Sequence, residues 1–378
     1  MFTMTFSDDQ KDLQKMVREF AQKKVAPVAL ELDRDGTFPK ELFDELIAMG
    51  LHCLPAPEEF DGPELDSLTS AIITEELAKA DVGFATTACA NGLASYPVIL
   101  AGTKEQQKIF FDIVMAGKMA AFALTEPNAG SDAGAVATTA KLEGDEYVLN
   151  GTKCFITNGG LADVYTVFAT VDRSKGLKGL CAFLVERNRP GISVGKEEDK
   201  MGIRNTNTTD VIFQDVRIPK THLLGKEGEG FKIAMQTLDI ARPIVGALGV
   251  GLSQAALDHS IKYAKERVQF GKPIAANQVI QFMLADMAIQ TEAARALVYQ
   301  AAYLKDSGQA STFHAAICKT FAGDTAMAVS TDAVQIFGGY GYSREYPVEK
   351  LMRDAKILQI FEGTNQVQRM VIAGQLLK

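Results

Sequence analysis

The sequence has few of the residues that bind metals or form disulfide bonds. Its 378 residues include four histidines and five cysteines. The histidines are scattered, and none stands at metal-ligand spacing from a cysteine or a carboxylate, so we expect no metal site. The cysteine number is odd and no Cys-x-x-Cys pair occurs. This pattern favours reduced, mostly buried thiols in a cytoplasmic protein.

Positive residues are fewer than acidic ones, and long apolar runs are absent. The formal net charge is -8, which argues against nucleic acid as a partner and against a basic membrane-binding face. No stretch of about 18 uninterrupted apolar residues occurs, so we expect no membrane span. The first residues lack a basic segment followed by an apolar run, so we expect no signal peptide.

The apolar pattern divides the chain into three predicted domains and an α+β, multidomain fold class. Residues 1–118 show helical periodicity, with capping-box patterns at Ser7–Gln10 and Thr103–Gln106. Residues 119–228 contain short apolar runs separated by turns, which predicts a small β-barrel or a sandwich of two stacked sheets. Residues 229–378 contain long apolar-striped segments with short connections, which predicts a helical bundle.

Individual elements can be placed within these domains. We expect a hairpin over residues 141–156 that turns at Gly144-Asp145 in a type I′ turn. The other expected strands are 120–124, 164–171, 180–185, 211–213 and 216–218. The expected C-terminal helices are 229–267, 277–306 and 311–337, with a last helix near 366–376.

One carboxylate near the end of the chain stands between an apolar residue and a glycine, in Phe361-Glu362-Gly363. A carboxylate pressed against apolar neighbours resists ionisation and can accept a proton near neutral pH. Alternatively, Glu362 is a surface residue at a helix end, and Gly363 is its C-cap glycine. The local pattern leaves both interpretations open, since perturbed carboxylates are a minority that cluster at functional sites.

Three other segments offer groups to a ligand. Leu124–Asp132 carries the hydroxyls of Thr125 and Ser131, and Gly151–Asn158 brings an aromatic residue and a threonine to a turn. Gln335–Gly341 contains a Gly-Gly-x-Gly run with accessible backbone N–H groups. Each of these segments could equally be an ordinary polar loop or strand end.

The charged residues of the C-terminal part are also ambiguous. Asp239 and Arg242 stand inside an apolar helix, where such a pair is more often structural or solvated than functional. Arg267 could reach a phosphate or could complement a helix C-terminus. Gly225–Phe231 fits neither G-x-G-x-x-G nor the P-loop pattern, so neither a nicotinamide Rossmann site nor an ATP site is indicated.

Taken together, these segments resemble the acyl-CoA dehydrogenase family, in particular its short- and medium-chain or butyryl-CoA dehydrogenases. The matching segments are, in order, Leu124–Asp132, Gly151–Asn158, Asp239–Pro243, Arg267–Gly271, Gln335–Gly341 and Tyr346–Gly363. The resemblance implies a helical N-terminal domain, a middle β domain, a C-terminal four-helix bundle, bound FAD and a homotetramer. It also implies oxidation of the α–β bond of an acyl-CoA thioester to the 2-enoyl-CoA, with electrons passed to an electron-transferring flavoprotein.

The resemblance assigns a role to each matching residue. Glu362 would take the α-proton while the β-hydrogen leaves as hydride to flavin N5. The thioester oxygen would accept hydrogen bonds from the backbone N–H of Glu362 and from a ribityl hydroxyl of FAD. The residues that match FAD contacts, some across a subunit contact, are Phe122, Leu124, Thr125, Ser131, Phe155, Thr157, Arg267, Gln269, Phe270, Gln278, Gln335, Gly338, Gly339, Thr364 and Gln366. The residues that match substrate contacts are Ser131, Asp239, Arg242 and Gly363.

The sequence departs from many relatives at Phe361, where they have Tyr, and at Phe155, where they have Trp. Neither change removes a catalytic group. The stretch Cys89–Leu93, expected to line the pocket floor, lacks the arginine that pairs with a distal carboxylate in the glutarate-handling branch. Apolar residues and glycine around Val245–Gly246 disfavour the branches that carry the base on that helix.

The expected protein is therefore a bacterial-type, cytoplasmic enzyme of fatty acid β-oxidation for short or medium acyl groups. Branched or alicyclic acyl groups remain open. Three alternatives are an enoyl-CoA reductase working in the reverse direction, an acyl-CoA oxidase, and a flavin-binding scaffold without turnover. Oxygen consumption without an added acceptor would mark the oxidase, and a colourless protein would favour a non-catalytic one.

Overall fold

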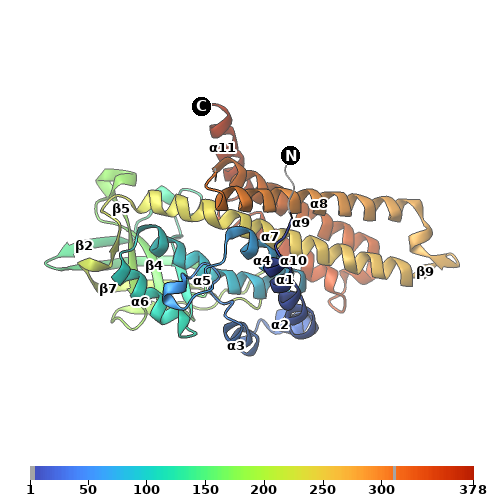
Figure 1. Cartoon of the computed structure of the whole chain (residues 1–378), viewed down its shortest axis with the longest axis horizontal. Helices are drawn as coiled ribbons and strands as arrows, with labels where there is room; N and C mark the ends of the chain where they lie inside the picture. Colours follow the sequence, from blue (N-terminus) through green and yellow to red (C-terminus); the bar gives the residue numbers. More distant parts are fainter. Residues whose placement is uncertain (1–4, 310–311) are drawn as a thin grey trace.

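The computed structural model describes residues 5–309 and 312–378. Ser311, the predicted start of one helix, and the first four residues lie outside the described part. The molecule is elongated, with the β sheet at one end and long helices running from it to the other end (Figure 1). This arrangement of helices, sheet and helices confirms the predicted fold class.

The N-terminal part is helical. Its helices are α1 (Asp8–Phe20), α2 (Ala29–Asp35), α3 (Lys40–Ala48), α4 (Ser67–Ala80), α5 (Val82–Ala101) and α6 (Lys104–Met115). Both predicted capping boxes are confirmed. The Ser7 hydroxyl accepts a hydrogen bond from the N–H of Gln10, and the Thr103 hydroxyl accepts one from the N–H of Gln106. The start of α1 and of α6 is therefore encoded locally.

Eight strands of the described residues form one sheet. They are β1 (Ala120–Ala123), β2 (Thr139–Glu143), β3 (Glu146–Thr157), β4 (Val164–Thr170), β5 (Leu180–Glu186), β6 (Ile192–Val194), β7 (Thr208–Pro219) and β8 (Leu223–Leu224). Their order is β6-β7-β3-β2-β4-β5-β8, and β1 pairs with β4.

The sheet folds into two wings that face each other. One wing contains β6, β7, β3 and β2, and the other contains β4, β5, β8 and β1. Strands β2 and β4 are joined by one residue pair, Thr139 with Thr170. Tyr147, in β3 of the first wing, packs edge-on against Phe183, in β5 of the second wing, with ring centroids 5.0 Å apart. Both rings belong to one core that strands of the two wings share. Of the two predicted arrangements, the stacked sheets therefore describe the structure better than a closed barrel.

Two details of the predicted strands are wrong. The hairpin does turn at Gly144-Asp145, because Glu143 pairs with Glu146. Gly144 has a φ of +65°, whereas Asp145 does not have a positive φ. A type I′ turn needs positive φ at both residues, but a type II′ turn needs it only at the first, where glycine stands here. The strands predicted at 211–213 and 216–218 are one strand, β7, bent where Asp215 has a φ of +50°.

The C-terminal part is a helical bundle. Its helices are α7 (Gly230–Glu266), α8 (Gln278–Asp306), α9 (Thr312–Phe337), α10 (Pro347–Leu358) and α11 (Asn365–Leu376). The sequence analysis did not predict α10, which begins with Pro347 in its first turn. A small hairpin of β9 (Val268–Gln269) and β10 (Lys272–Pro273) connects α7 to α8 at the end of the molecule away from the sheet (Figure 1).

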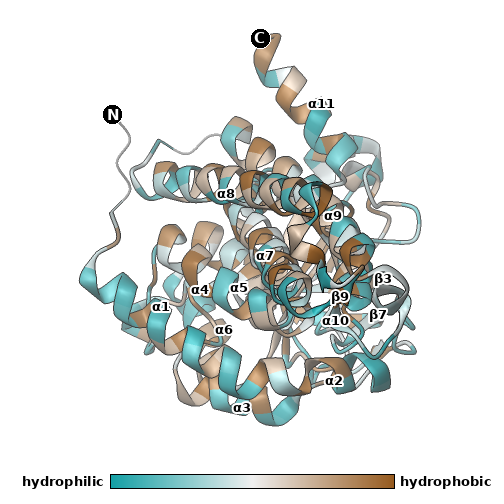
Figure 2. Cartoon of the chain, turned by 90° about the vertical axis from the view of Figure 1, so that its right-hand side faces the viewer, coloured by the Kyte–Doolittle hydropathy of each residue, from teal (hydrophilic) through white to brown (hydrophobic). Residues whose placement is uncertain are grey.

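Two helices of the described residues have the length and composition of a membrane span, although the sequence contains no uninterrupted apolar run of that length. These are α5 and α7, but 67% and 89% of their apolar windows are buried inside the protein. Helix α7 lies in the middle of the bundle, surrounded by α4, α5, α8 and α9 (Figure 2). Packing within the chain therefore accounts for the apolar composition of α7.

Candidate active site

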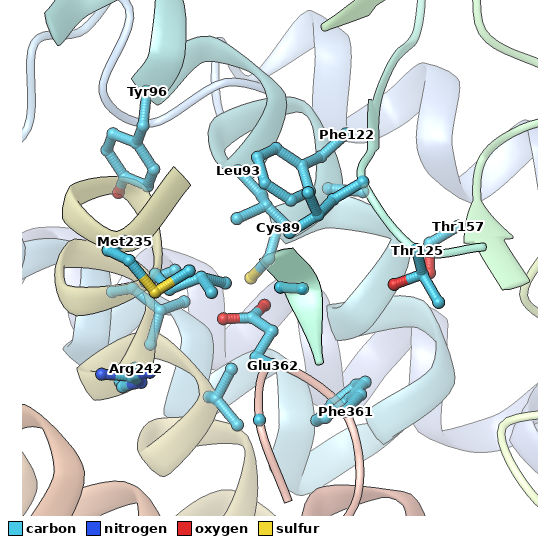
Figure 3. A pocket seen from close by; sticks show the side chains of 18 of the residues that line it. Cys89, Leu93, Tyr96, Phe122, Thr125, Thr157, Met235, Arg242, Phe361 and Glu362 are labelled. Carbon is cyan, nitrogen blue, oxygen red and sulfur yellow. The ribbon is translucent and has the colours of Figure 1, made fainter. Parts of the chain in front are cut away.

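A cavity of about 510 Å³ lies where the sheet meets α5, α7 and the loop between α10 and α11 (Figure 3). The predicted site residues that line it are Phe122, Leu124, Thr125, Ser131, Phe155, Thr157, Arg242, Glu362 and Gly363. They come from four separate segments of the sequence. The cavity is mainly apolar, with few polar groups, as is typical of a ligand site.

Glu362 projects its carboxylate into this cavity from the loop between α10 and α11 (Figure 3). Desolvation by the surrounding protein raises its pKa to about 7, although the positive charges of Lys319 and Arg242 oppose this shift. Its Oε2 atom is buried and forms no hydrogen bond within the described residues. The carboxylate therefore has an open acceptor and a pKa suited to proton transfer near neutral pH.

The backbone that carries Glu362 is strained. Glu362 has a φ of +52° and Gly363 has a φ of +94°, a region that costs about 1–3 kcal/mol for a residue other than glycine. The N–H of Glu362 forms no hydrogen bond within the described part of the chain. Glu362 thus offers both a carboxylate and a free N–H donor next to each other.

Three buried side chains hold this loop. Gln368 Nε2 donates to the carbonyl oxygens of Glu362 and Gly363, both at 3.2 Å. Lys319 Nζ, from α9, donates to the carbonyl oxygen of Gly363 at 2.8 Å and to Oδ1 of Asn365 at 3.0 Å. A Cβ atom at Gly363 would lie 2.4 Å from Gln368 Nε2, and the φ of +94° is one that side chains other than glycine rarely adopt, so both features favour glycine here.

Arg242 and Asp239 form an ion pair on α7. Arg242 Nη1 lies 2.5 Å from Oδ1 of Asp239, whose other oxygen accepts a hydrogen bond from the Thr312 hydroxyl at 2.6 Å. Arg242 is buried and lines the cavity, whereas Asp239 does not. Burial lowers the pKa of Arg242 below its usual value, which the nearby carboxylates of Asp239 and Glu362 oppose. The pair orients a buried guanidinium toward the cavity.

The polar loop 124–132 is fixed to β3 by a buried ion pair. Lys153 Nζ donates to the carbonyl oxygen of Leu124 at 3.0 Å and to Oε1 of Glu126 at 2.7 Å. Glu126 in turn accepts hydrogen bonds from the N–H groups of Ala137 and Thr138 at 2.6 and 2.9 Å. This network holds the Thr125 end of the loop beside the cavity.

The end of β3 presents an aromatic face to the cavity. Phe155 has a φ of +56°, and 65% of its surface is exposed. The hydroxyl-bearing residues Thr125 and Thr157 lie together on one side of Glu362 (Figure 3). An exposed aromatic ring with nearby hydroxyls fits a flat ligand with polar edges, such as a flavin ring.

The other predicted FAD residues do not reach this cavity within one chain. Arg267, Gln269, Phe270 and Gln278 lie around the β9–β10 hairpin, away from the sheet (Figure 1). The Arg267 guanidinium lies 5.1 Å from the ring centre of Tyr340. Gly338, Gly339 and Gln335 closely precede Tyr340 in the chain, so they lie near the same end of α7. Thr364 caps α11 by accepting a hydrogen bond from the N–H of Val367 at 3.2 Å, and neither Thr364 nor Gln366 lines the cavity. Their FAD contacts remain predictions.

The structure adds residues that the sequence analysis did not single out. Tyr96 and Met235 line one side of the cavity together with Leu93 (Figure 3). Lys319 holds the loop that carries Glu362. Lys319 had a readable signal, since it is a lone charge in the apolar segment Ala315–Ala322. Tyr96 and Met235 had none, because an aromatic residue or methionine in an apolar helix indicates core by default.

The predicted pocket floor does line the cavity, through Cys89, Ala90, Gly92 and Leu93. Asn91 points elsewhere and accepts a hydrogen bond from the N–H of Ala120 at 2.7 Å. Burial raises the pKa of the Cys89 thiol to about 12, so it is protonated at neutral pH and is not a nucleophile. In residues 5–309 and 312–378, no group of three or more metal-binding side chains occurs and no cysteine forms a disulfide.

Comparison with known proteins places these residues in a family context. Three protein-family models match the chain, and together they span most of it. They are the acyl-CoA dehydrogenase N-terminal domain at residues 7–118, the middle domain at 121–216 and the C-terminal domain at 228–377.

Two curated relatives match along their whole length. The short-chain specific acyl-CoA dehydrogenase of Megasphaera elsdenii is 50% identical, covering 98% of this chain and 99% of the relative. The acryloyl-CoA reductase (NADH) of Anaerotignum propionicum is 48% identical, covering 98% of this chain and 95% of the relative.

Solved structures of similar chains have the same fold. Butyryl-CoA dehydrogenase from Megasphaera elsdenii matches with a TM-score of 0.97 and 49% identity over 100% of both chains. A chain in the structure of the electron transferring flavoprotein of Acidaminococcus fermentans matches with a TM-score of 0.97 and 48% identity, also over 100% of both chains. PigA, solved with FAD and proline, matches with a TM-score of 0.94 and 32% identity over 99% of both chains.

Proposed function

The chain belongs to the acyl-CoA dehydrogenase family, a family of FAD-dependent oxidoreductases that act on CH–CH bonds, and we propose that it oxidises short-chain acyl-CoA thioesters with Glu362 as the α-proton acceptor. The observation that carries this proposal is the position of Glu362. Its carboxylate faces an apolar cavity, carries an open acceptor and has a pKa near 7.

The residues of this chain supply alignment and a base. An α-C–H beside a thioester is a weak acid, so the thioester oxygen must be stabilised where enolate charge develops. The free N–H of Glu362 belongs to the same residue as the base and is the donor available for that oxygen. The adjacent carboxylate then accepts the α-proton. When bound beside Phe155, Thr125 and Thr157, FAD supplies the hydride acceptor for the β-hydrogen.

Residues around the cavity support the cofactor assignment. The exposed ring of Phe155 and the hydroxyls of Thr125, Ser131 and Thr157 form one side of the cavity. The loop that carries two of them is tied to β3 by the buried Lys153–Glu126 pair. A preorganised site of this kind costs little conformational entropy when the ligand binds.

A short acyl group and an electron-transferring flavoprotein are the partners that the comparisons favour. The most similar relatives and structures include enzymes named for short-chain or butyryl substrates. Another matching chain comes from the structure of an electron transferring flavoprotein. Leu93, Tyr96 and Met235 line the cavity on the side away from Thr125 and Thr157, and their bulk favours a short acyl chain. We also propose a role in cytoplasmic β-oxidation; the odd number of cysteines and the lack of a Cys-x-x-Cys pair, which favour reduced thiols, support the location.

A homotetramer is the proposed assembly. Apolar side chains are exposed on α8, at Val279, Phe282 and Ile289, which are between 61% and 65% exposed. Phe270, at the tip of the β9–β10 hairpin, is 97% exposed. Exposed apolar residues in such a group support contact with a second copy of the chain. Phe282→Asp is expected to lower the native mass measured by sedimentation, and an unchanged mass would remove this face from the interface.

Reduction of a 2-enoyl-CoA is the second candidate function. A relative with 48% identity is named acryloyl-CoA reductase (NADH). The geometry suits both directions, because a carboxyl group with a pKa near 7 can donate the α-proton as readily as it accepts one. The two directions differ in the electron donor or acceptor and not in the base.

The test is anaerobic bleaching of the bound flavin by a panel of acyl-CoAs. The panel runs from butyryl- to palmitoyl-CoA and includes isovaleryl-, glutaryl- and cyclohexanecarboxyl-CoA. Fast bleaching by butyryl-CoA and slow bleaching by palmitoyl-CoA is the expected result. No bleaching by any member, in a protein that carries FAD, would overturn the proposal. Oxidation of NADH by crotonyl-CoA or acryloyl-CoA, with the electron-transferring flavoprotein added, would identify the reductive direction.

A further inference from the structure

Lys319 is a charged residue in a place where charge is costly. It lies in the first half of α9 and is fully buried, although the residues around it are mostly apolar. Burial of an ammonium group costs several kcal/mol unless it is paired and hydrogen-bonded. Its partners within hydrogen-bond distance are the carbonyl oxygen of Gly363 and Oδ1 of Asn365. Both are neutral, so Lys319 forms no direct ion pair with the residues that the structure describes.

The groups that Lys319 contacts belong to the loop that carries Glu362. Gly363 directly follows Glu362 and has a φ of +94°. Asn365 begins α11 and donates to the carbonyl oxygen of Thr320 and to Oδ1 of Asp324, at 3.1 and 2.8 Å. The Lys319 ammonium thus joins α9 to the start of α11 across the strained turn.

We propose that Lys319 is a positioning residue for the reaction: by bonding the Gly363 carbonyl it fixes the orientation of the Glu362 N–H and carboxylate, and its positive charge favours the ionised form of that carboxylate. The inference rests on the proposed function only in so far as Glu362 is the base. A mainly structural lysine would bind the loop equally well but would have no effect on the ionisation of Glu362.

The groups around Glu362 show which charge can affect its ionisation. The groups that face Glu362 are Lys319 from α9, Arg242 from α7, and the thiol and phenol of Cys89 and Tyr96 from α5. Cys89 has a raised pKa and stays neutral. Arg242 already pairs with Asp239 at 2.5 Å. Among the described residues, Lys319 is therefore the positive charge near Glu362 that no carboxylate directly neutralises.

Other charges act on Lys319 itself. Arg242 disfavours its protonated form, while Glu362 and Asp324 favour it. Asp324 already forms an ion pair with Arg369 at 2.6 Å and accepts hydrogen bonds from the side-chain amides of Asn365 and Gln359. The net result of burial and these charges is a Lys319 pKa of about 8. Glu362 and Lys319 each favour the charged form of the other.

Three substitutions separate charge from hydrogen bonding. Lys319→Met removes both, Lys319→Gln keeps an N–H donor without charge, and Lys319→Arg keeps the charge with altered geometry. Thr320→Val is the matched control, because Thr320 is the next residue of α9 and its hydroxyl bonds only within the helix, to Ala316 at 2.8 Å. FAD content and thermal unfolding identify the variants that fold.

The first readout is the infrared titration of the Glu362 carboxyl group, assigned by its loss in Glu362→Gln. It needs no substrate, so it is independent of the proposed function. Lys319→Met and Lys319→Gln are expected to move the midpoint up by about 1 pH unit, which is the lower end of the effect of an adjacent opposite charge. Lys319→Arg and Thr320→Val are expected to keep the wild-type midpoint. An unchanged midpoint in a folded neutral variant would overturn the inference.

The second readout is the pH profile of flavin reduction by butyryl-CoA. Its acid limb is expected to shift with the carboxyl midpoint in the neutral variants, and a fixed limb would contradict a role of Lys319 in the reaction. If the carboxyl midpoint moves but no acyl-CoA bleaches the flavin even in the wild type, the proposed function fails and the link between Lys319 and Glu362 stands.

A measurement on the wild-type lysine covers the case in which neither neutral variant folds. The ¹⁵N shift of the Lys319 ammonium, in protein labelled at lysine side chains, is expected to show a step near pH 7 as Glu362 ionises. That step should be absent in Glu362→Gln. A Lys319 signal that shows no such step would also overturn the inference.

Discussion

Nζ of Lys350 lies 2.7 Å from Oδ2 of Asp81, although 268 residues separate the two in the chain (positions 81 and 350). Asp81 is the N-cap of α5, and Lys350 lies on α10, where it also pairs with Asp354 at 2.5 Å. Asp354 accepts a hydrogen bond from the N–H of Ile203 at 2.6 Å. One buried cluster therefore joins the first helical part, the end of the sheet region and the C-terminal bundle.

Removing the charge of Lys350 is expected to destabilise the protein strongly. In Lys350→Met the two carboxylates of Asp81 and Asp354 would be left buried without a counter-charge. Loss of one partner of a buried ion pair costs about 3–5 kcal/mol. Thermal unfolding followed by circular dichroism should show a large fall in the midpoint. Lys356→Met, an exposed position on the same helix, should change stability by no more than about 0.5 kcal/mol. Equal effects of the two variants would show that the cluster contributes little.

Glu362→Gln is expected to retain FAD and acyl-CoA binding but to lose nearly all dehydrogenation. The amide keeps the size of the side chain and cannot accept the α-proton. A positioned general base contributes about 10²–10⁴-fold to the rate, so the rate of flavin reduction by butyryl-CoA should fall by that range. Glu345→Gln, an exposed position before α10, is the control. More than a few per cent of residual rate would place the base elsewhere.

The pH dependence of the wild-type enzyme follows from the raised pKa of Glu362. Only the ionised carboxylate accepts a proton, and burial raises its pKa to about 7. For dehydrogenation, kcat/KM should therefore rise about tenfold per pH unit below pH 7 and level off above it. Steady-state rates with an artificial acceptor from pH 5.5 to 8.5 measure this profile. A flat profile across that range would mean that Glu362 has an ordinary carboxyl pKa in the free enzyme.

The sequence predicted features that depend on neighbouring residues. The capping residues Ser7 and Thr103, the turn position at Gly144-Asp145 and the long apolar helices all appear in the structure at the expected places. Glu362 was chosen for its apolar neighbours and its resemblance to a family base, and it does line the cavity.

Features that depend on distant residues were missed. Lys319 lies 43 positions before Glu362, and nothing local indicates that its ammonium reaches the carbonyl of Gly363. The pairing of Lys153 with Glu126 and of Lys350 with Asp81 likewise depends on tertiary packing. The predicted type I′ turn was wrong because glycine stands at the first central position, which suits a type II′ turn.

The depth of the cavity makes the acyl preference testable. Leu93, Tyr96 and Met235 lie on one side of Glu362, and Thr125 and Thr157 lie on the other (Figure 3). Tyr96 is the largest of the three, so Tyr96→Ala should open room for a longer acyl chain. One methylene in an apolar pocket is worth about 1–3 kcal/mol. The ratio of kcat/KM for octanoyl-CoA over butyryl-CoA should therefore rise at least about tenfold.

Leu177→Ala is the matched control for the acyl preference, because Leu177 also lines the cavity but is 48% exposed and so lies toward its mouth. It should leave the ratio of octanoyl- to butyryl-CoA turnover unchanged, since an exposed wall does not limit the length of the chain. FAD content confirms that both variants fold. If Tyr96→Ala lowers turnover of both substrates equally, the phenol supports the fold of α5 and does not close the acyl site. A ratio that rises in Leu177→Ala instead would place the end of the acyl chain near η5 (Arg173–Gly179).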